Sequence, residues 1–442
     1  MLISILIRKP NLQSDGYPEI TRGELHSFLE SKGHTVASNP YEPDINAELI
    51  IINAQVIEDI YYSLIDDILY RTSINQVICI IGNPVACARD FIYEKYRRIN
   101  AIIPGEYENV IINIINNIES KTDLKNIIGI YKEKKNLPEQ RSININYDEF
   151  PMPDFSYLYY DSSFYNKICY LTTSRECNGK CSFCEGYIYR TIVNNCCKKY
   201  KTADRVIEEI IHVNTAYQQS IIAFSDDNFF PNPEEGKLRA YELAEKILSK
   251  KIKIKFILNC RADNVDYEIF KLLKRAGLMK VFIGYESGSE AVLQRYDKQI
   301  SVDSSIMAIK TLNQLNIRCD CGIIMFDPWT EIGELRQTIE FFKKYEFQMA
   351  VEWNGKSILH MAGHTKLRKM FIDQAKASSN FIFNEDYFHN VYKGFIPYPF
   401  FNKTIMKIYG YYMNNLKKIN MYDRKNILNN TLELLERAIV EY

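Results

Sequence analysis

The sequence predicts an α/β protein: a doubly wound parallel sheet at the amino terminus, then a partial (β/α)6 barrel of the TIM type, then a helical carboxyl-terminal region. Three observations support this prediction. Short apolar runs alternate with helical patterns over residues 1–120, a connector rich in proline and tyrosine interrupts them, and a second strand and helix series begins near residue 168. The length of 442 residues fits two or three domains.

The first domain is expected over residues 1–125. Strands are predicted at residues 2–7, 49–53, 77–81 and 101–104, and helices around residues 23–32 and 61–71. In such a sheet a ligand binds beyond the carboxyl ends of the strands. A linker is expected over residues 126–162, where Pro151 and Pro153 favour an extended path.

The second domain, the partial barrel, is expected over residues 163–360. Its strands are predicted at residues 168–173, 220–224, 254–259, 280–284 and 318–325, with a sixth strand before residue 360, and Thr202 is expected to cap the first long helix. Repeated units of this length place their chemistry at the carboxyl ends of the strands. The helical region over residues 361–442 either caps the barrel mouth or packs outside it.

The composition limits the class of partner. With 46% hydrophobic and 25% charged residues the chain is globular, and 55 basic against 55 acidic residues give a net charge of zero. The equal numbers of basic and acidic residues argue against nucleic acid and against an anionic membrane as binding partners. No run reaches the roughly 18 to 20 apolar residues of a membrane span, and residues 1–7 lack the basic lead of a signal peptide. We therefore expect a cytoplasmic protein.

Three of the eleven cysteines form a CxxxCxxC pattern: Cys177, Cys181 and Cys184. Three thiolates on a four-iron cluster leave one iron open to a cofactor, whereas a structural zinc would need a fourth ligand. Buried thiols are the alternative, but the polar neighbours Asn178 and Lys180 disfavour it. The odd number of cysteines, and their lack of the even, spread-out spacing typical of disulfide-bonded secreted proteins, indicate a reducing compartment.

The remaining cysteines are expected to be structural. Cys79, Cys169 and Cys260 lie in apolar strand-like runs, where burial accounts for them. For the pairs at residues 196–197 and 319–321, we expect neighbouring side chains to point apart, which disfavours a second cluster.

Several further stretches follow the cysteine motif in a fixed order. They are residues 224–229 (FSDDNF), 259–263 (NCRAD), 272–277 (LLKRAG), 284–289 (GYESGS) and 326–330 (FDPWT), with Phe183 directly before the third cysteine. With these motifs the chain resembles the radical S-adenosylmethionine (SAM) superfamily, in the branch with an amino-terminal cobalamin-binding-type Rossmann domain. The resemblance covers about residues 1–360.

The resemblance implies a [4Fe-4S] cluster on Cys177, Cys181 and Cys184, with the open iron binding the amino and carboxylate groups of SAM. One electron would then release a 5′-deoxyadenosyl radical. It further implies that Phe183 supports the adenine, that Asp226 or Asp227 accepts hydrogen bonds from the ammonium, that Arg261 pairs with the carboxylate, and that Glu286 and Ser287 hold the ribose or the carboxylate. Taken singly, each of the five polar residues in this set could instead face solvent at a strand end or cap the next helix.

The chain departs from the family pattern in three places. Arg175-Glu176 stands where Arg-Gly is usual, Gly82-Asn83 replaces a double glycine, and the Asp-x-His-x-x-Gly signature that supplies an axial histidine is absent. Some relatives bind cobalamin without that histidine and others have lost the cofactor, so cobalamin stays open.

The leading hypothesis is a radical SAM enzyme that modifies an unactivated C–H bond of a natural-product or peptide substrate, with a flavodoxin or ferredoxin as reductant. With cobalamin the reaction would be C-methylation; without it, epimerisation, dehydration or rearrangement. A non-catalytic iron–sulfur protein is the alternative from another class. A nucleic-acid-modifying relative is disfavoured by the balanced charge.

Overall fold

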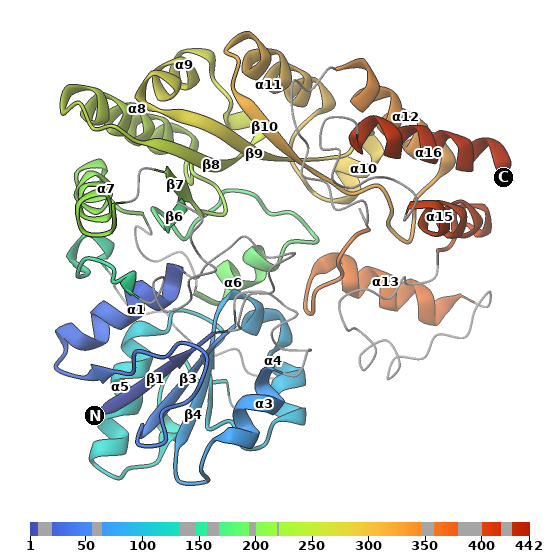
Figure 1. Cartoon of the computed structure of the whole chain (residues 1–442). Coiled ribbons are helices and arrows are strands. Elements are labelled where there is room, and N and C mark those ends of the chain that lie inside the picture. Colours follow the sequence, from blue (N-terminus) through green and yellow to red (C-terminus); the bar gives the residue numbers. More distant parts are fainter. Residues whose placement is uncertain are drawn as a thin grey trace.

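The structure is a computed structural model of the chain. It describes residues 1–7, 20–54, 64–131, 146–156, 168–193, 200–218, 221–345, 358–378, 400–416 and 427–442. Two parallel sheets follow one another along the chain, each accompanied by helices, and further helices form the carboxyl-terminal region (Figure 1). This arrangement confirms the predicted fold class.

The amino-terminal sheet is fully parallel, with strand order β2-β1-β3-β4-β5. Its strands are β1 (Leu2–Leu6), β2 (Thr35–Val36), β3 (Leu49–Asn53), β4 (Val77–Ile81) and β5 (Ala101–Ile102). Four of them are the predicted strands; the two-residue β2, at the edge of the sheet, is additional. Every residue of β3 is buried, as expected for a parallel strand covered on both faces.

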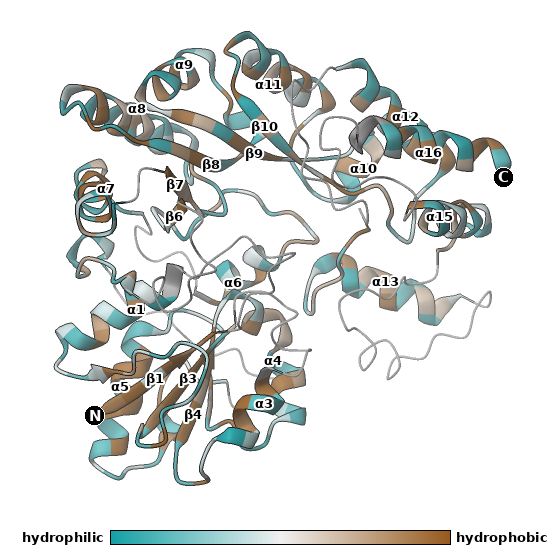
Figure 2. Cartoon of the chain, in the orientation of Figure 1, coloured by the Kyte–Doolittle hydropathy of each residue, from teal (hydrophilic) through white to brown (hydrophobic). Residues whose placement is uncertain are grey.

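Helices cover both faces of this sheet. α1 (Ile20–Ser31) and α5 (Glu108–Glu119) pack on one face, and α3 (Leu64–Arg71) and α4 (Asn83–Lys95) on the other. Alternate strand residues point to opposite faces of the sheet. Ile51 belongs to the core under α1 and α5, and Ile50 and Ile52 belong to the core under α3 and α4. Figure 2 shows these strands as hydrophobic ribbons between helices of mixed polarity.

The strand order reverses direction between β1 and β3, and ligands of doubly wound folds bind beyond the carboxyl ends of strands at such a point. The loops after these two strands, residues 8–19 and 55–63, lie outside the described residues. After β4, Gly82 has φ +118°, and a Cβ there would overlap the carbonyl oxygen of Ala54. This close approach of two loops requires glycine at position 82.

The second sheet is also parallel, with strand order β10-β9-β8-β7-β6. Its strands are β6 (Ile168–Leu171), β7 (Ile221–Phe224), β8 (Lys255–Arg261), β9 (Leu278–Glu286) and β10 (Arg318–Ile323). All five match predicted strands. A sixth is represented within the described residues by a single parallel bridge between Phe326 and Ile358, and residues 346–357 lie outside them.

Seven helices accompany this sheet in the described residues: α6 (Glu185–Val193), α7 (Ala203–Tyr217), α8 (Pro233–Ser249), α9 (Tyr267–Ala276), α10 (Glu290–Arg295), α11 (Val302–Gln314) and α12 (Ile332–Lys344). All but α6 contribute to the core of this sheet, whereas α6 packs on α4 of the amino-terminal sheet. Thr202 caps α7 as predicted, because its side chain accepts a hydrogen bond from the amide of Arg205. Val281, Ile283 and Tyr285 of β9 face the helices, so Gly284 between them lies on the opposite, inner face.

The linker is described over residues 146–156. A 3-10 turn, Tyr147–Glu149, leads into an extended segment in which Phe155 is buried in the core of the second sheet. The hydroxyl group of Tyr217 accepts a hydrogen bond from the amide of Phe155 at 3.1 Å. The linker is thus packed against α7.

The carboxyl-terminal helices are α13 (Lys366–Ala377), α15 (Lys403–Leu416) and α16 (Ile427–Glu441). Their apolar residues join the core of the second sheet; Phe326, for example, packs against Tyr412 of α15 at a centroid distance of 5.7 Å. At the start of α13 the amide of Leu367 donates to the carbonyl of Ser182 at 3.1 Å, which ties this helix to the cysteine motif. No helix in the described ranges combines the length and apolarity needed to cross a membrane.

Candidate active site at the cysteine loop

Cys177, Cys181 and Cys184 lie in one loop between β6 and α6, at the carboxyl end of the first strand of the second sheet. We call residues 173–184 the cysteine loop. Its path is fixed at two ends: the amides of Thr173 and Ser174 donate to Oδ1 of Asp226 at 2.6 and 2.9 Å, and the amide of Ser182 donates to the carbonyl of Tyr296 at 2.8 Å. The loop position agrees with chemistry at the carboxyl ends of barrel strands.

Gly179 lies close to two of the sulfur atoms. A Cβ at this position would lie 3.4 Å from Sγ of Cys177, 3.6 Å from Sγ of Cys181 and 2.8 Å from Nη1 of Arg261. Cys184 is near enough to Cys181 for their charges to interact. Glycine at this position lets the backbone pass close to both sulfurs and to Arg261, where a side chain would collide with the guanidinium.

The donor set of three thiols suits a cluster better than a structural zinc ion, which would need a fourth ligand. Among the described residues, no three side chains of the ligating types come close enough together to hold one metal ion. A four-iron cluster needs a wider gap, because each cysteine binds a different iron. Without metal, burial raises the pKa of Cys177 and raises that of Cys184 to about 12, so binding iron would displace protons from the thiols. The residues present therefore fit the cluster.

Three cations lie near the cysteines themselves, and each is paired with a carboxylate. Arg190 pairs with Asp227 at 3.2 Å and donates to the carbonyl of Gly179 at 2.9 Å. Arg261 forms two bonds to Asp263, at 3.0 and 3.1 Å. Opposite charges nearby offset the anionic character that thiolates give to such a site.

The third cation is Lys298, whose Nζ lies 2.7 Å from Oε1 of Glu286 in a buried pair. A Cβ on Gly284 would overlap this carboxylate, so the pair lies on the inner face of the sheet. Arg261 donates to the carbonyl of Lys298 at 2.8 Å, which links the second and third cations. No motif in the sequence indicated Lys298, which stands nine residues after the GYESGS stretch ends at Ser289.

Backbone strain gathers beside this pair. Glu286, Asp297 and Gln299 have φ values of +63°, +48° and +58°, in the left-handed region that non-glycine residues seldom adopt. Such conformations persist where surrounding structure holds them and are concentrated at functional sites. The strain marks the rim formed by the end of β9 and residues 295–299.

The two adjacent aspartates occupy different environments. Asp226 is buried, and both of its oxygens accept hydrogen bonds from Thr173 and Ser174. Asp227 keeps 41% of its side-chain surface exposed; partial loss of hydration raises the pKa of its carboxyl group, and the nearby Arg190 lowers it. Only Asp227 of the two has a carboxylate open to a ligand.

The other residues predicted to bind SAM also differ in burial and in their contacts within the protein. Phe183 is partly buried and meets the ring of Tyr296 edge-on at 5.3 Å. Ser287 is buried, and its hydroxyl lies within hydrogen-bond distance of the hydroxyl of Thr338, at 2.8 Å. The same hydroxyl accepts a hydrogen bond from the amide of Ser289. Arg261 lies close to the cysteine sulfurs and is bonded to Asp263, and Glu286 is bonded to Lys298, so Arg261 and Glu286, like Asp226 and Ser287, have partners inside the protein.

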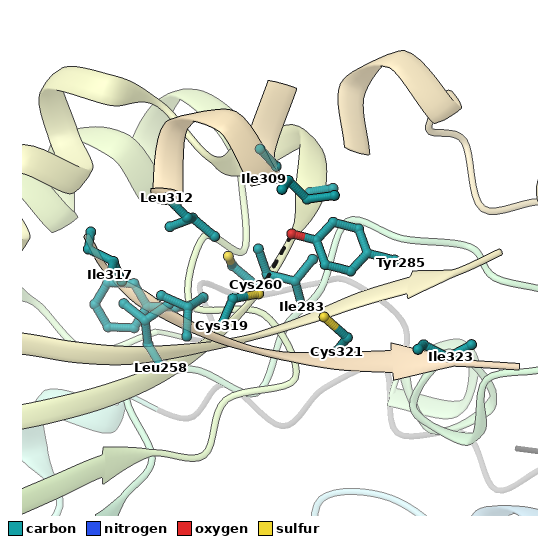
Figure 3. Close-up of a cluster of buried hydrophobic side chains, with 14 of the residues drawn as sticks. Leu258, Cys260, Ile283, Tyr285, Ile309, Leu312, Ile317, Cys319, Cys321 and Ile323 are labelled. Carbon is teal, nitrogen blue, oxygen red and sulfur yellow. Dashed lines mark hydrogen bonds between the residues drawn. The ribbon is translucent and has the colours of Figure 1, made fainter. Parts of the chain in front are cut away.

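The expectation that Cys319 and Cys321 point apart is wrong. Side chains two residues apart on a strand share a face, and both thiols are buried on the outer face with Cys260 (Figure 3). Sγ of Cys319 lies 3.6 Å from the hydroxyl of Tyr285, under Ile309 and Leu312 of α11. Cys79, Cys169 and Cys260 are buried as predicted, and residues 196–197 lie outside the described residues.

The amino-terminal sheet turns its carboxyl edge toward the cysteine loop. Glu106, just after β5, binds Arg175 of the cysteine loop at 2.8 Å. α4, just after β4, packs on α6, and Ala86 and Cys87 share a buried cluster with Ile188. A ligand at this edge would therefore face the three cysteines.

Comparisons with known proteins agree with this geometry. Residues 171–342 match the profile of the radical SAM superfamily. The chain is 27% identical over 288 residues to an uncharacterized methyltransferase of Pyrococcus horikoshii, covering 63% of this chain and 60% of that protein. It is 26% identical over 297 residues to the 4′-phospho-dehydrooxetanocin synthase of Priestia megaterium, covering 62% and 39%. The chain thus spans about three-fifths and two-fifths of the length of these relatives.

Two solved structures share the fold. The cobalamin-dependent SAM radical enzyme OxsB, with aqua-cobalamin bound, superposes with a TM-score of 0.72 over 99% of this chain and 71% of its own, at 17% identity. The radical SAM methyltransferase TsrM of Kitasatospora setae, with cobalamin and a [4Fe-4S] cluster bound, has a TM-score of 0.65 over 85% and 78%, at 13% identity.

Proposed function

Because the chain belongs to the radical SAM superfamily, we propose that it is an enzyme that cleaves SAM reductively and modifies a C–H bond of a small-molecule or peptide substrate, by methyl transfer when the amino-terminal domain carries cobalamin. The observation that carries the proposal is the convergence of the sulfurs of Cys177 and Cys181 on Gly179, beside the guanidinium of Arg261. When bound there by the three cysteines, the cluster supplies the electron that splits SAM.

The residues around the loop have distinct roles in this proposal. We assign the SAM ammonium to the exposed carboxylate of Asp227 and the adenine to the exposed part of Phe183. Arg261, beside the cysteine sulfurs, and Glu286, bonded to Lys298, would meet the carboxylate and ribose of SAM, while Asp226 and Ser287 hold the framework. The carboxyl-terminal helices and the inner face of the sheet exclude water from the radical.

Cobalamin is proposed from the position of the amino-terminal domain. Its carboxyl edge faces the cysteine loop, and the fold is shared with two cobalamin-bound enzymes. The loops after β1, β3 and β4 contain no histidine, so no imidazole of these loops would ligate the cobalt. Asn83, where a second glycine is usual, is exposed, whereas residues 84–89, which follow it in α4, are buried.

The test is product analysis of anaerobically reconstituted protein. With SAM and dithionite, or with reduced flavodoxin as the proposed physiological donor, 5′-deoxyadenosine should accumulate, and Cys181→Ala should abolish it. Protein produced with cobalamin should show corrin absorption bands. No 5′-deoxyadenosine from cluster-loaded protein would contradict the enzyme proposal and favour a non-catalytic iron–sulfur protein; absent corrin bands would contradict methyl transfer and leave a cobalamin-independent reaction.

A further inference from the structure

Arg175 connects the cysteine loop to the amino-terminal domain. It lies two residues before Cys177, keeps only 10% of its side-chain surface exposed, and extends into the other domain. There Nη1 binds Glu106 at 2.8 Å, and Nη2 binds Glu108 at 2.6 Å and Glu24 at 3.3 Å. One guanidinium thus joins three carboxylates contributed by α1, by the residues after β5 and by the start of α5.

Two aromatic rings fix the orientation of this guanidinium. Its central carbon lies 5.3 Å from the ring centroid of Tyr107 and 5.0 Å from that of Tyr147. Tyr147 also donates from its hydroxyl to Oε1 of Glu106 at 3.0 Å. The directed hydrogen bonds to the carboxylates and the packing on both rings depend on the planar guanidinium of arginine, which lysine lacks.

The backbone that carries Arg175 is the one that leads into the cluster site. Thr173 and Ser174, immediately before it, are held by Asp226, and Gly179, four residues after it, is held by Arg190. Between these two anchors, Arg175 has a buried side chain that is bound to the other domain. A change in its anchoring would move the segment that carries Cys177.

Lys201 provides a natural comparison. It binds Glu24 at 2.8 Å and Glu209 at 2.9 Å, so it too joins the domains through a buried ion pair. It precedes α7, and its backbone amide, which a side-chain replacement leaves in place, donates to the carbonyl of Thr173 at 2.8 Å; among the described contacts its side chain reaches Glu24 and Glu209 but not the cysteine loop. Loss of either cation weakens the interface, but only loss of Arg175 would alter the approach to Cys177.

We propose that Arg175 is a positioning residue: anchored in the amino-terminal domain, it sets the path of the chain into Cys177 and thereby makes the cluster site depend on that domain. The inference rests on the proposed function, since it presupposes a cluster on the three cysteines. It identifies the means by which a ligand at the carboxyl edge of the first sheet would influence the cluster.

The experiment compares Arg175→Lys and Arg175→Gln with Lys201→Gln in anaerobically reconstituted full-length protein. We measure iron content, the paramagnetic resonance spectrum with and without SAM, the KM for SAM in 5′-deoxyadenosine formation, and Tm. Outer-shell partners of metal ligands typically contribute 10- to 100-fold, so we expect both Arg175 variants to raise the KM or lower iron retention by about 10-fold and to change the spectrum. Lys201→Gln should lower Tm and leave the spectrum and KM as in the wild type.

Glu106→Gln is the second variant, because it changes the anchor from the side of the other domain. It should change the spectrum in the same direction as Arg175→Lys. In the double variant, the effect on the KM for SAM and on iron retention should be smaller than the sum of the two single effects. Should Arg175→Gln fail to fold, these two variants decide the question. Arg175 variants that change only Tm, as Lys201→Gln does, would overturn the inference, whereas a wild type without cluster signal would instead overturn the proposed function.

Discussion

The adjacent residues Asp226 and Asp227 give a test in which one variant controls the other. In Asp226→Asn the side chain keeps one carbonyl oxygen for the amides of Thr173 and Ser174, but the new Nδ2 group faces the hydroxyl of Thr173. That hydroxyl already accepts a hydrogen bond from Arg239 at 2.9 Å and must donate to residue 226. An NH2 group cannot accept this hydrogen bond, so a charged hydrogen bond is lost in a buried site.

The expected cost follows from that single loss. A hydrogen bond to a charged group contributes about 1.5 to 3 kcal/mol, and Asp226→Asn should lower the free energy of unfolding by about this amount. Asp227 is 41% exposed and has one ion pair, so Asp227→Asn should cost less than about 1 kcal/mol. The roles reverse for the cofactor: Asp227→Asn should raise the KM for SAM by about 10-fold because a carboxylate is lost from the proposed ammonium site.

The assay pairs denaturant unfolding of each variant with the rate of 5′-deoxyadenosine formation at varied SAM. Wild type and both variants are prepared together under the same anaerobic conditions. A larger loss of stability in Asp227→Asn than in Asp226→Asn, or a KM that rises only in Asp226→Asn, would refute the division of the two carboxylates into a framework residue and a ligand residue.

Three further predictions follow from individual contacts. Gly82→Ala should lower the free energy of unfolding by about 2 kcal/mol or more in thermal or denaturant unfolding, because the new Cβ overlaps the carbonyl of Ala54 at a positive φ; unchanged stability would contradict the close approach. Burial raises the pKa of Glu108 above its ordinary value of 4.5, and its Oε2 has no hydrogen-bond partner in the described structure. The folded state then holds this proton more tightly, so stability is full below pH 4.5 and falls as pH rises toward the folded-state pKa; Glu108→Gln should remove that part of the slope in Tm against pH, and an unchanged slope would refute it. Replacing Cys319 and Cys321 together by Ala should leave the iron content per chain unchanged, whereas a loss of iron would indicate a second cluster.

Local pattern explains what could be predicted from the sequence. The apolar runs that became β3 and β4 are short, rich in isoleucine and bounded by polar residues, so both their position and their burial follow from periodicity. The three cysteines could be identified because their spacing itself constrains the chemistry. The error at Cys319 and Cys321 arose from applying the strand period incorrectly, since residues i and i+2 share a face.

Long-range pairing explains what could not be predicted. Arg175 meets carboxylates 67, 69 and 151 residues away, and no periodic signal connects such positions. Lys298 is brought to Glu286 by the strained turn around Gln299, which is a property of the folded backbone. Asp226 and Asp227 read alike in the sequence, and only the packing of Thr173 and Arg190 distinguishes them.

The central claim is that three cysteine ligands leave one iron of a cluster open to SAM. The most direct measurement is paramagnetic resonance of the dithionite-reduced, reconstituted protein before and after SAM is added. The account predicts a [4Fe-4S]⁺ signal whose g values change with SAM in the wild type and that is absent when Cys177, Cys181 and Cys184 are all replaced by Ala. A cluster signal that SAM leaves unaltered, or one that survives the triple replacement, would contradict it.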